Sequence, residues 1–135
     1  MNIKLKSTKV TSLMLEGNEE TESGDFEFSY SQGYSEDKDK EFTIRFESVI
    51  GLEEGVKLEI VFDADFVCDE RISEKFKDSH FPSVNAPAIA FPYLRVFISN
   101  FSLNSGYDTV ILPAINFQAL AKKKAEKNKN KKEKV

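Results

Sequence analysis

The sequence predicts an α+β fold: a four-stranded antiparallel sheet with a long helix and a C-terminal helix packed on one face. Three observations support this prediction. Four stretches in the first half of the chain alternate apolar and polar residues at the period of a strand, and short polar turns separate them. The alternation stops near Asp69, and the longest apolar-rich run, residues 85–120, comes after it. Strands that are followed by helices are typical of a sheet with its helices on one face.

The strands are expected at residues 2–16, 25–34, 42–48 and 56–68. The first alternates imperfectly, which predicts a bend or bulge near residues 7–9. The second carries an aromatic face, and the fourth alternates along its length with a middle weakened by Ala64 and Asp65. Polar loops are expected between the strands, at residues 17–24, 35–40 and 51–55.

Helical signals follow the last strand. A short helix is expected at residues 69–78 with Asp69 as its N-cap, and residues 80–86 are read as a connector. An extended connector at residues 107–114 leads to a last helix that begins near Ile115, with Asn116 as a candidate N-cap. These elements complete the helical layer of the predicted fold.

The long helix is expected to begin near Asn85 and to end before Gly106, a candidate C-cap. Pro92 lies within it, and periodicity alone predicts either a kink or a restart there. On a helical projection the apolar residues cover an arc of roughly 240°, far wider than the ~100° stripe of a surface helix. The polar stripe contains only Pro92, Arg95, Ser99 and Ser102. Since one small sheet can cover only one face, the second face predicts a contact with another subunit.

Composition describes one soluble domain of 135 residues, 40% hydrophobic and 31% charged. Cys68 is the only cysteine, which excludes a disulfide within the chain and fits a reducing compartment. The first residues lack the apolar core of a signal peptide, and no run of about 20 apolar residues predicts membrane insertion. We therefore expect a cytoplasmic protein.

The net charge of −4 is divided unevenly along the chain. Residues 122–135 contain eight lysines and two glutamates, a net charge of +6, so residues 1–121 carry −10. The acidic body argues against nucleic-acid binding by the folded part. We divide the chain into a domain at residues 1–121 and a Lys-rich helix end or disordered tail at residues 122–135, whose simplest interpretation is a solvated helix end.

Catalytic signals are weak. His80 lies in a proline-bounded connector without a cysteine or second histidine near it, and Cys68 is more simply a small strand hydrophobe. The fourth strand and the residues after it contain a carboxylate cluster, Asp63, Asp65, Asp69 and Glu70. It lacks the glycine and spacing of a calcium loop, so a solvated strand end is favoured over a cation site. No phosphate-binding glycine loop or GxSxG is present, so we expect no enzyme, no metal and no cofactor.

Apolar surface remains as the functional signal. The long helix, the aromatic strand and the connector at residues 110–113 supply more apolar surface than one small core needs, although at least half of the strand's aromatic side chains are expected in the core. An apolar groove with an acidic rim suits the binding of extended, unfolded polypeptide.

Two motifs in this part of the chain resemble the SecB family of protein-export chaperones. The long helix contains Ala90-Phe91-Pro92-Tyr93-Leu94-Arg95, similar to the family's Ile/Leu-Phe-Pro-Tyr-x-Arg. After Gly106, residues 112–120 read Leu-Pro-Ala-Ile-Asn-Phe-Gln-Ala-Leu, similar to the motif that opens the family's last helix. The resemblance covers most of residues 3–121, and it favours one long helix that tolerates Pro92.

The resemblance implies a SecB-like homotetramer, in which two chains join their sheets and two such dimers pack through their long helices. It also implies an ATP-independent holding chaperone that keeps preproteins unfolded in apolar grooves and passes them to the SecA motor. The candidate client-binding residues are Phe26, Phe28, Tyr30, Tyr34, Ile115, Phe117 and Leu120. The candidate oligomer-interface residues are Ile89, Tyr93, Val96, Phe97 and Asn100.

By position, Glu16 and Glu59 match the acidic residues with which the family docks SecA. Ser12 and Lys57 stand where the family has an acidic and an apolar residue, the tail is basic, and the family's groove tryptophan is missing. Two alternatives therefore stay open. One is a SecB-like chaperone dedicated to a single partner such as an antitoxin, and the other is an adaptor or small-ligand-binding protein on the same scaffold.

Overall fold

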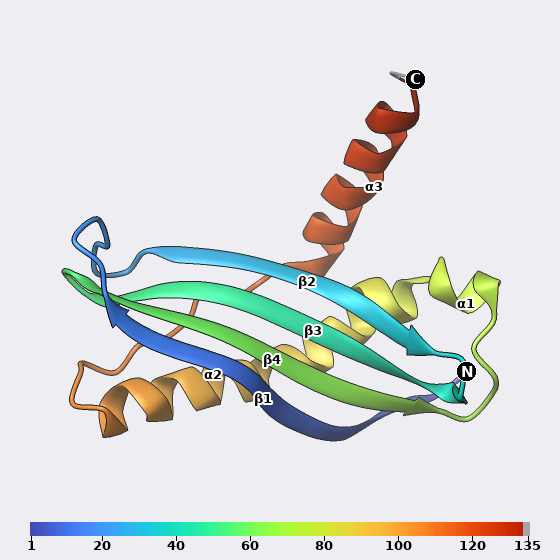
Figure 1. Ribbon diagram of the computed structural model, residues 1–135. Coiled ribbons are helices and arrows are strands. Elements are labelled where there is room, and N and C mark those ends of the chain that lie inside the picture. Colours follow the sequence, from blue (N-terminus) through green and yellow to red (C-terminus); the bar gives the residue numbers. More distant parts are fainter. Residues whose placement is uncertain (134–135) are drawn as a thin grey trace.

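One antiparallel sheet of four strands organises the chain, in the order β1-β4-β3-β2. Its strands are β1 (Ile3–Gly17), β2 (Phe26–Ser35), β3 (Lys38–Glu53) and β4 (Val56–Cys68). The computed structural model describes residues 1–133, with side chains through residue 127. Helix α2 (Ala86–Asn104) runs along one face of the sheet, and α3 (Phe117–Glu133) extends away from it (Figure 1). The predicted fold class is confirmed.

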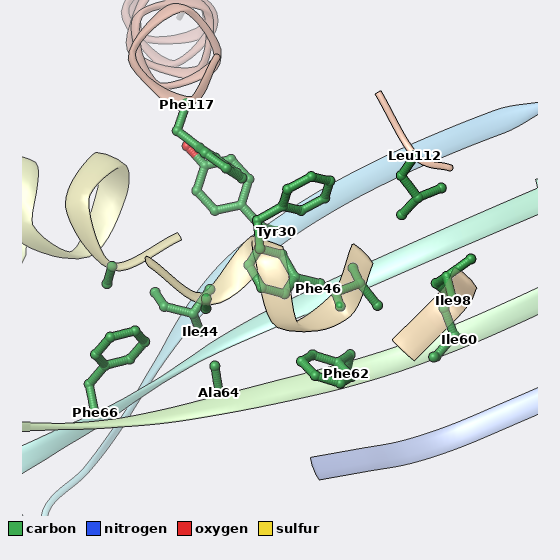
Figure 2. Packing of buried hydrophobic residues seen from close by; sticks show 14 of the residues in the cluster. Tyr30, Ile44, Phe46, Ile60, Phe62, Ala64, Phe66, Ile98, Leu112 and Phe117 are labelled. Atoms are coloured by element: carbon green, nitrogen blue, oxygen red, sulfur yellow. The ribbon is translucent and has the colours of Figure 1, made fainter. Parts of the chain in front are cut away.

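Alternation along the two central strands builds the core. In β4 every second residue from Leu58 to Cys68 is buried, and its register with β3 sets Phe62 opposite Phe46 and Phe66 opposite Phe42. These side chains share the face on which α2 lies, and Figure 2 shows Phe46, Phe62 and Phe66 together with Ile98 of α2 and Phe117 of α3. The strand alternation that the sequence predicts is therefore what separates the apolar face from the polar one.

Strands β1 and β2 occupy opposite edges of the sheet, so the segment between them crosses its end. The Gly24 N–H donates to the Gly51 carbonyl at 3.0 Å, and the Gly51 N–H donates to the Asp25 carbonyl at 2.8 Å. A Cβ at Gly51 would lie 1.9 Å from the Glu22 carbonyl oxygen. Gly51 is thus the residue of β3 on which the segment between β1 and β2 packs, and it has no room for a side chain.

Two of the predicted loops are wrong in length. Strand β3 begins at Lys38 and ends at Glu53, because charged residues at its ends still pair with the neighbouring strands. The turn after β2 therefore contains only residues 36–37, and the next turn only residues 54–55. The expected irregularity of β1 is present as register shifts between Leu5 and Ser7 and between Val10 and Ser12.

The short helix is also shorter than predicted. Helix α1 comprises Glu74–Lys77, and Ser73 rather than Asp69 is its N-cap, accepting from the Phe76 N–H at 3.1 Å. The carboxylate of Asp69 instead accepts from the Asn2 N–H at 2.9 Å. Part of the predicted connector forms a π-helix, η1 (Phe81–Asn85), directly before α2.

Pro92 lies inside a single α2, as the family resemblance favoured. The helix ends at Asn104, and Gly106 follows it with a φ of +94° that suits glycine. The Gly106 and Tyr107 N–H groups donate to the Leu103 and Ser102 carbonyls at 3.2 and 3.0 Å. This is a Schellman ending and confirms the predicted C-cap region.

Ser102 was expected on a polar stripe, and the structure buries it completely. Its hydroxyl accepts from the Val110 N–H at 2.9 Å and donates to the Ser99 carbonyl at 3.0 Å, while the Ser99 hydroxyl donates to the Val110 carbonyl at 2.7 Å. The two serines therefore fix the connector onto α2, which explains their polarity on a covered face.

Helix α3 is capped by Asn116, whose side-chain carbonyl accepts from the Ala119 N–H at 3.0 Å, as predicted. Among its described side chains Phe117 is the buried one, and residues 122–127 are exposed and rich in lysine. Of the predicted Lys-rich tail, residues 134–135 lie outside the described residues.

Candidate functional site

An aromatic row lies along the helix-facing side of β2 and is continued by α3; we define it as Phe26, Phe28, Tyr30 and Phe117. Phe28 is its centre, with ring centroids 5.9 Å from Phe26, 6.3 Å from Tyr30 and 6.1 Å from Phe117. Strand alternation places the β2 members on one face, and Asn116 starts α3 where Phe117 turns toward Tyr30 (Figure 2). The structure thus joins two segments that are about ninety residues apart in sequence.

The members of the row differ in exposure. Tyr30 and Phe117 are each 4% exposed, and their contact with a client stays a prediction. They are covered because α3 packs on β2, with their rings perpendicular at 5.3 Å. Phe26 and Phe28 are half-buried, as are Ile115 and Leu120. The accessible part of the row therefore comes from Phe26 and Phe28, and Ile115 and Leu120 add half-buried apolar surface at the start of α3.

Tyr30 links three elements. Its hydroxyl donates to the Ser83 carbonyl of η1 at 2.8 Å, and burial raises the pKa of its phenol. The Lys124 ammonium lies 3.9 Å from the centroid of its ring and donates to its backbone carbonyl. Burial lowers the pKa of Lys124. Gln32 adds a second contact between β2 and η1, through the Pro82 carbonyl at 3.0 Å.

Tyr34 does not join the aromatic row. Its ring lies 6.2 Å from Phe42, beneath the ammonium of Lys77 at 4.7 Å, near α1. Burial, with the nearby Cys68, Asp78 and Glu74 adding to it, raises the pKa of Tyr34 to about 12. Tyr34 therefore lies apart from the other predicted client-binding residues, which belong to β2 and to the start of α3.

A second apolar surface lies on α2, on the side turned away from the sheet. Its exposed apolar side chains are Ile89 at 42%, Tyr93 at 53%, Val96 at 59% and Leu103 at 59%. Together with Asn100 they repeat at intervals of four and three residues, so they form one stripe along the helix, which we call the α2 stripe. Phe97, also predicted here, is half-buried beside Phe62 at 6.3 Å and lies at the margin of the stripe.

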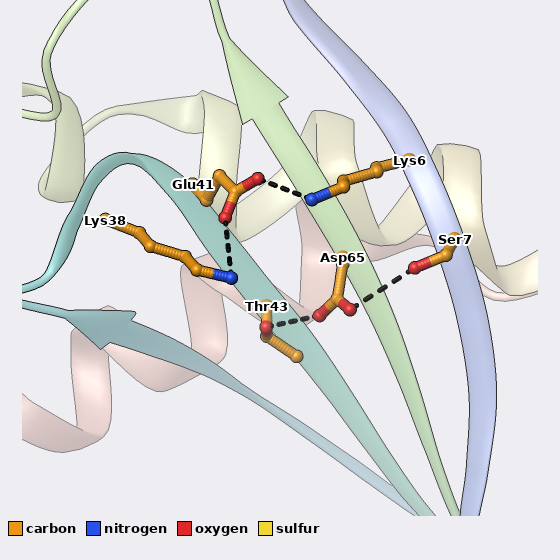
Figure 3. Close-up of polar contacts among 6 residues, drawn as sticks. All are labelled: Lys6, Ser7, Lys38, Glu41, Thr43 and Asp65. Atoms are coloured by element: carbon orange, nitrogen blue, oxygen red, sulfur yellow. Dashed lines mark hydrogen bonds and ion pairs between the residues drawn. The ribbon is translucent and has the colours of Figure 1, made fainter.

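The outer face of the sheet is polar. Glu41 lies between Lys6 at 2.7 Å and Lys38 at 3.5 Å, and Asp65 accepts from Thr43 and Ser7 at 2.6 and 3.3 Å (Figure 3). The hydrogen bond from Lys6 lowers the pKa of Glu41. A cavity of about 620 Å³ opens over this network. Because its charged groups are paired with each other, the cavity offers little to hold a small ligand in one orientation.

The suggested carboxylate cluster is separated by its partners. Arg45 binds Asp63 through two hydrogen bonds of 2.8 and 2.9 Å, Asp65 contacts hydroxyls, and Asp69 accepts from Asn2. Across the described part of the chain no group of three candidate metal-binding side chains converges. Burial raises the pKa of the Cys68 thiol, which makes it a poor nucleophile, and His80 is exposed.

Four exposed apolar positions were missed by the sequence analysis. Leu103 extends the α2 stripe by one turn, and its spacing from Tyr93 and Val96 could have identified it. Leu13, Met14 and Leu15 are 37%, 48% and 39% exposed on the edge strand β1. Three consecutive exposed apolar residues on a sheet edge are a signal for pairing with another chain, and the alternation pattern alone did not reveal it.

Comparison with known proteins identifies the family of the chain that carries these surfaces. A protein-family model described as preprotein translocase subunit SecB matches residues 23–128, which is most of the chain. The chain belongs to the SecB family. The match includes α2 with its Phe91-Pro92-Tyr93 segment and the start of α3, and β1 lies before it.

Solved structures confirm the SecB-like fold. The chain resembles the Mycobacterium tuberculosis SecB-like chaperone that was solved in complex with a ChAD peptide from the HigA1 antitoxin, with a TM-score of 0.65, 10% identity, and coverage of 84% of this chain and 90% of that one. It also resembles a Streptococcus agalactiae protein of unknown function, with a TM-score of 0.56, 13% identity, and coverage of 84% and 98%. Among curated proteins, none matches the sequence. Within residues 1–133, no helix is long and apolar enough to cross a membrane.

Glu16 and Glu59, which were predicted as SecA-docking candidates, lie together on the outer face at the end of β1. Lys57 lies between them, with its Nζ 3.2 Å from Glu16 and 3.1 Å from Glu59. Its hydrogen bonds to the two carboxylates raise the pKa of Lys57. Lys57 thus neutralises part of the negative charge of the Glu16 and Glu59 carboxylates. A cavity of about 560 Å³ with Met14 and Glu59 in its wall lies nearby.

Proposed function

We propose that this SecB-family chain is an ATP-independent holding chaperone that binds unfolded polypeptides through apolar side chains. The observation that carries the proposal is the apolar surface left exposed after the core is complete. It includes the α2 stripe, the accessible part of the aromatic row and the Leu13–Leu15 edge of β1. An apolar surface of this extent on a small domain is typical of a protein that binds other polypeptides.

The proposed assembly is a tetramer, arranged as a dimer of dimers. Edge-to-edge pairing would cover Leu13–Leu15, and packing of two α2 stripes would cover Tyr93 and Val96. The aromatic row lies on the opposite sheet edge from β1 and uses residues outside the α2 stripe, so both contacts would leave it available to a client.

The proposed clients are preproteins, and the proposed receiver is SecA in the cytoplasm. Glu16 and Glu59 support a docking site by their position, and Lys57 weakens it by neutralising charge. Binding of purified SecA to the wild type, to Glu59→Lys and to Lys57→Leu tests this proposal. We expect Glu59→Lys to weaken binding and Lys57→Leu to strengthen it. Equal, negligible binding by all three would remove SecA from the proposal and leave the holding function untouched.

The Lys57 ion pairs favour a second candidate function, a holding chaperone dedicated to one partner, in which the SecA contact is not used. The M. tuberculosis relative, which was solved with an antitoxin peptide, makes this a concrete alternative. Parallel capture with SecA and with proteins encoded next to this chain separates the two. Retention of one neighbour at high salt, together with no retention of SecA, would support the dedicated partner.

A further inference from the structure

The aromatic row lies beside the most basic element of the protein. Within its described side chains, α3 carries Lys122, Lys123, Lys124 and Lys127 and one acidic residue, Glu126. Lys124 lies two helical turns beyond Phe117 and therefore on the same face, which brings its ammonium onto Tyr30. Glu126 is about 180° away around the helix from Phe117. The face of α3 that continues the row is thus basic, while residues 1–121 carry a net charge of −10.

Helix α3 offers little apolar surface beyond this point. Leu120 and Ala121 are half-buried, and the described residues after them are all exposed, with only Ala125 apolar. A partner that runs from the aromatic row along α3 would therefore meet apolar side chains first and lysines next. The chemistry that complements this order is an apolar segment flanked by carboxylates.

We infer that the aromatic row and the lysines of α3 together select client segments in which acidic residues flank an apolar stretch. This inference rests on the proposed holding function and names its substrate class. Lys124 has a specific part in it. At rest its ammonium is held by the ring and carbonyl of Tyr30, and a client carboxylate offers it a charged partner instead.

The test uses two labelled synthetic peptides that share one apolar core of eight residues, one flanked at both ends by three glutamates and the other at both ends by three lysines. Fluorescence anisotropy with the full chain at low salt is expected to give the Glu-flanked peptide about five-fold tighter binding, since each exposed ion pair contributes a factor of roughly 1.4 to 5. Salt should reduce this preference. Reversal of Lys123, Lys124 and Lys127 to Glu should abolish or invert it.

A matched control keeps the change in net charge and moves it elsewhere. Lys4, Lys9 and Lys40 are exposed and lie on β1 and at the start of β3, away from α3. Their reversal to Glu should leave the preference within about two-fold of the wild type, with circular dichroism confirming the fold of both variants. Lys124→Gln, which keeps a hydrogen-bond donor without the charge, should lose part of the preference.

Equal affinity for both peptides, or an equal effect of the two triple reversals, would overturn the inference while the holding function stands. Failure of the wild type to bind either peptide or to delay aggregation of an unfolded protein would overturn the holding function and the inference with it. These outcomes differ in whether the apolar core binds at all, so the two failures can be distinguished.

Discussion

Replacing Tyr93 and Val96 by Asp should dissociate the proposed contact between α2 stripes. The four apolar side chains of the stripe are 42% to 59% exposed, so about half of each remains to be buried. Complete burial of such a side chain contributes about 1.5–3 kcal/mol, so the remaining half contributes roughly 1 kcal/mol. A symmetric pair of stripes doubles the sum, to about 8 kcal/mol. Losing two of the four positions removes about 4 kcal/mol, close to a thousand-fold in the dissociation constant.

Sedimentation velocity at micromolar concentration measures this effect. We expect the wild type to sediment as a tetramer and the double variant as a dimer, with unchanged circular dichroism because neither side chain is in the core. Ile111→Asp is the matched control, since Ile111 is 71% exposed in the connector and lies outside the stripe. A wild-type monomer, or a double variant with the wild-type mass, would refute the reasoning.

Three further predictions concern stability. Gly51→Ala should lower the free energy of unfolding by about 2 kcal/mol or more, because its Cβ would lie 1.9 Å from a backbone carbonyl oxygen. Gly33→Ala is the control: its Cβ would have its nearest contact at 3.9 Å, so it should cost under about 1 kcal/mol. Urea unfolding measures both changes. The pKa of Tyr34, raised to about 12, means that the folded state holds this proton more tightly, so stability should be full below pH 10 and fall between pH 10 and 12, and Tyr34→Phe should flatten that decline. Ser102→Ala should cost about 1–3 kcal/mol in thermal or urea unfolding because it leaves the half-buried Val110 N–H without its partner. Ser102→Thr keeps the hydroxyl and should cost less.

Much of the fold was predictable because alternation and capping act locally. The period of two along β4 fixed its buried face, and Asn116 identified the start of α3 within two residues. The ends of β3 were not predictable from polarity, since Lys38 pairs with Ser35 through backbone groups, and this pairing does not depend on the charge of the side chain. Asp69 and Ser73 are both good caps, and only the packing of Phe76 into the core decided between them.

The candidate site was predictable where it depends on one element and unpredictable where it depends on two. Helical spacing predicts a second apolar face on α2, and the same spacing connects Leu103 to Tyr93 and Val96. The burial of Tyr30 depends on the packing of α3 on β2. A helical projection of α2 could not show that the connector after it, through the Val110 N–H, would form a hydrogen bond with Ser102. The Lys57–Glu16 ion pair likewise depends on two elements, because β1 must pair with β4 before Glu16 lies next to Lys57.

Aggregation of an unfolded protein tests the central claim most directly. A model client unfolded in urea is diluted into buffer without nucleotide, and light scattering is followed with increasing amounts of the chain. We predict suppression of scattering near one tetramer per client, with no change on adding ATP, while an inert globular protein at the same mass concentration has no effect. Scattering that rises equally fast with the chain and with the inert protein would contradict the proposal that this SecB-family protein is a holding chaperone.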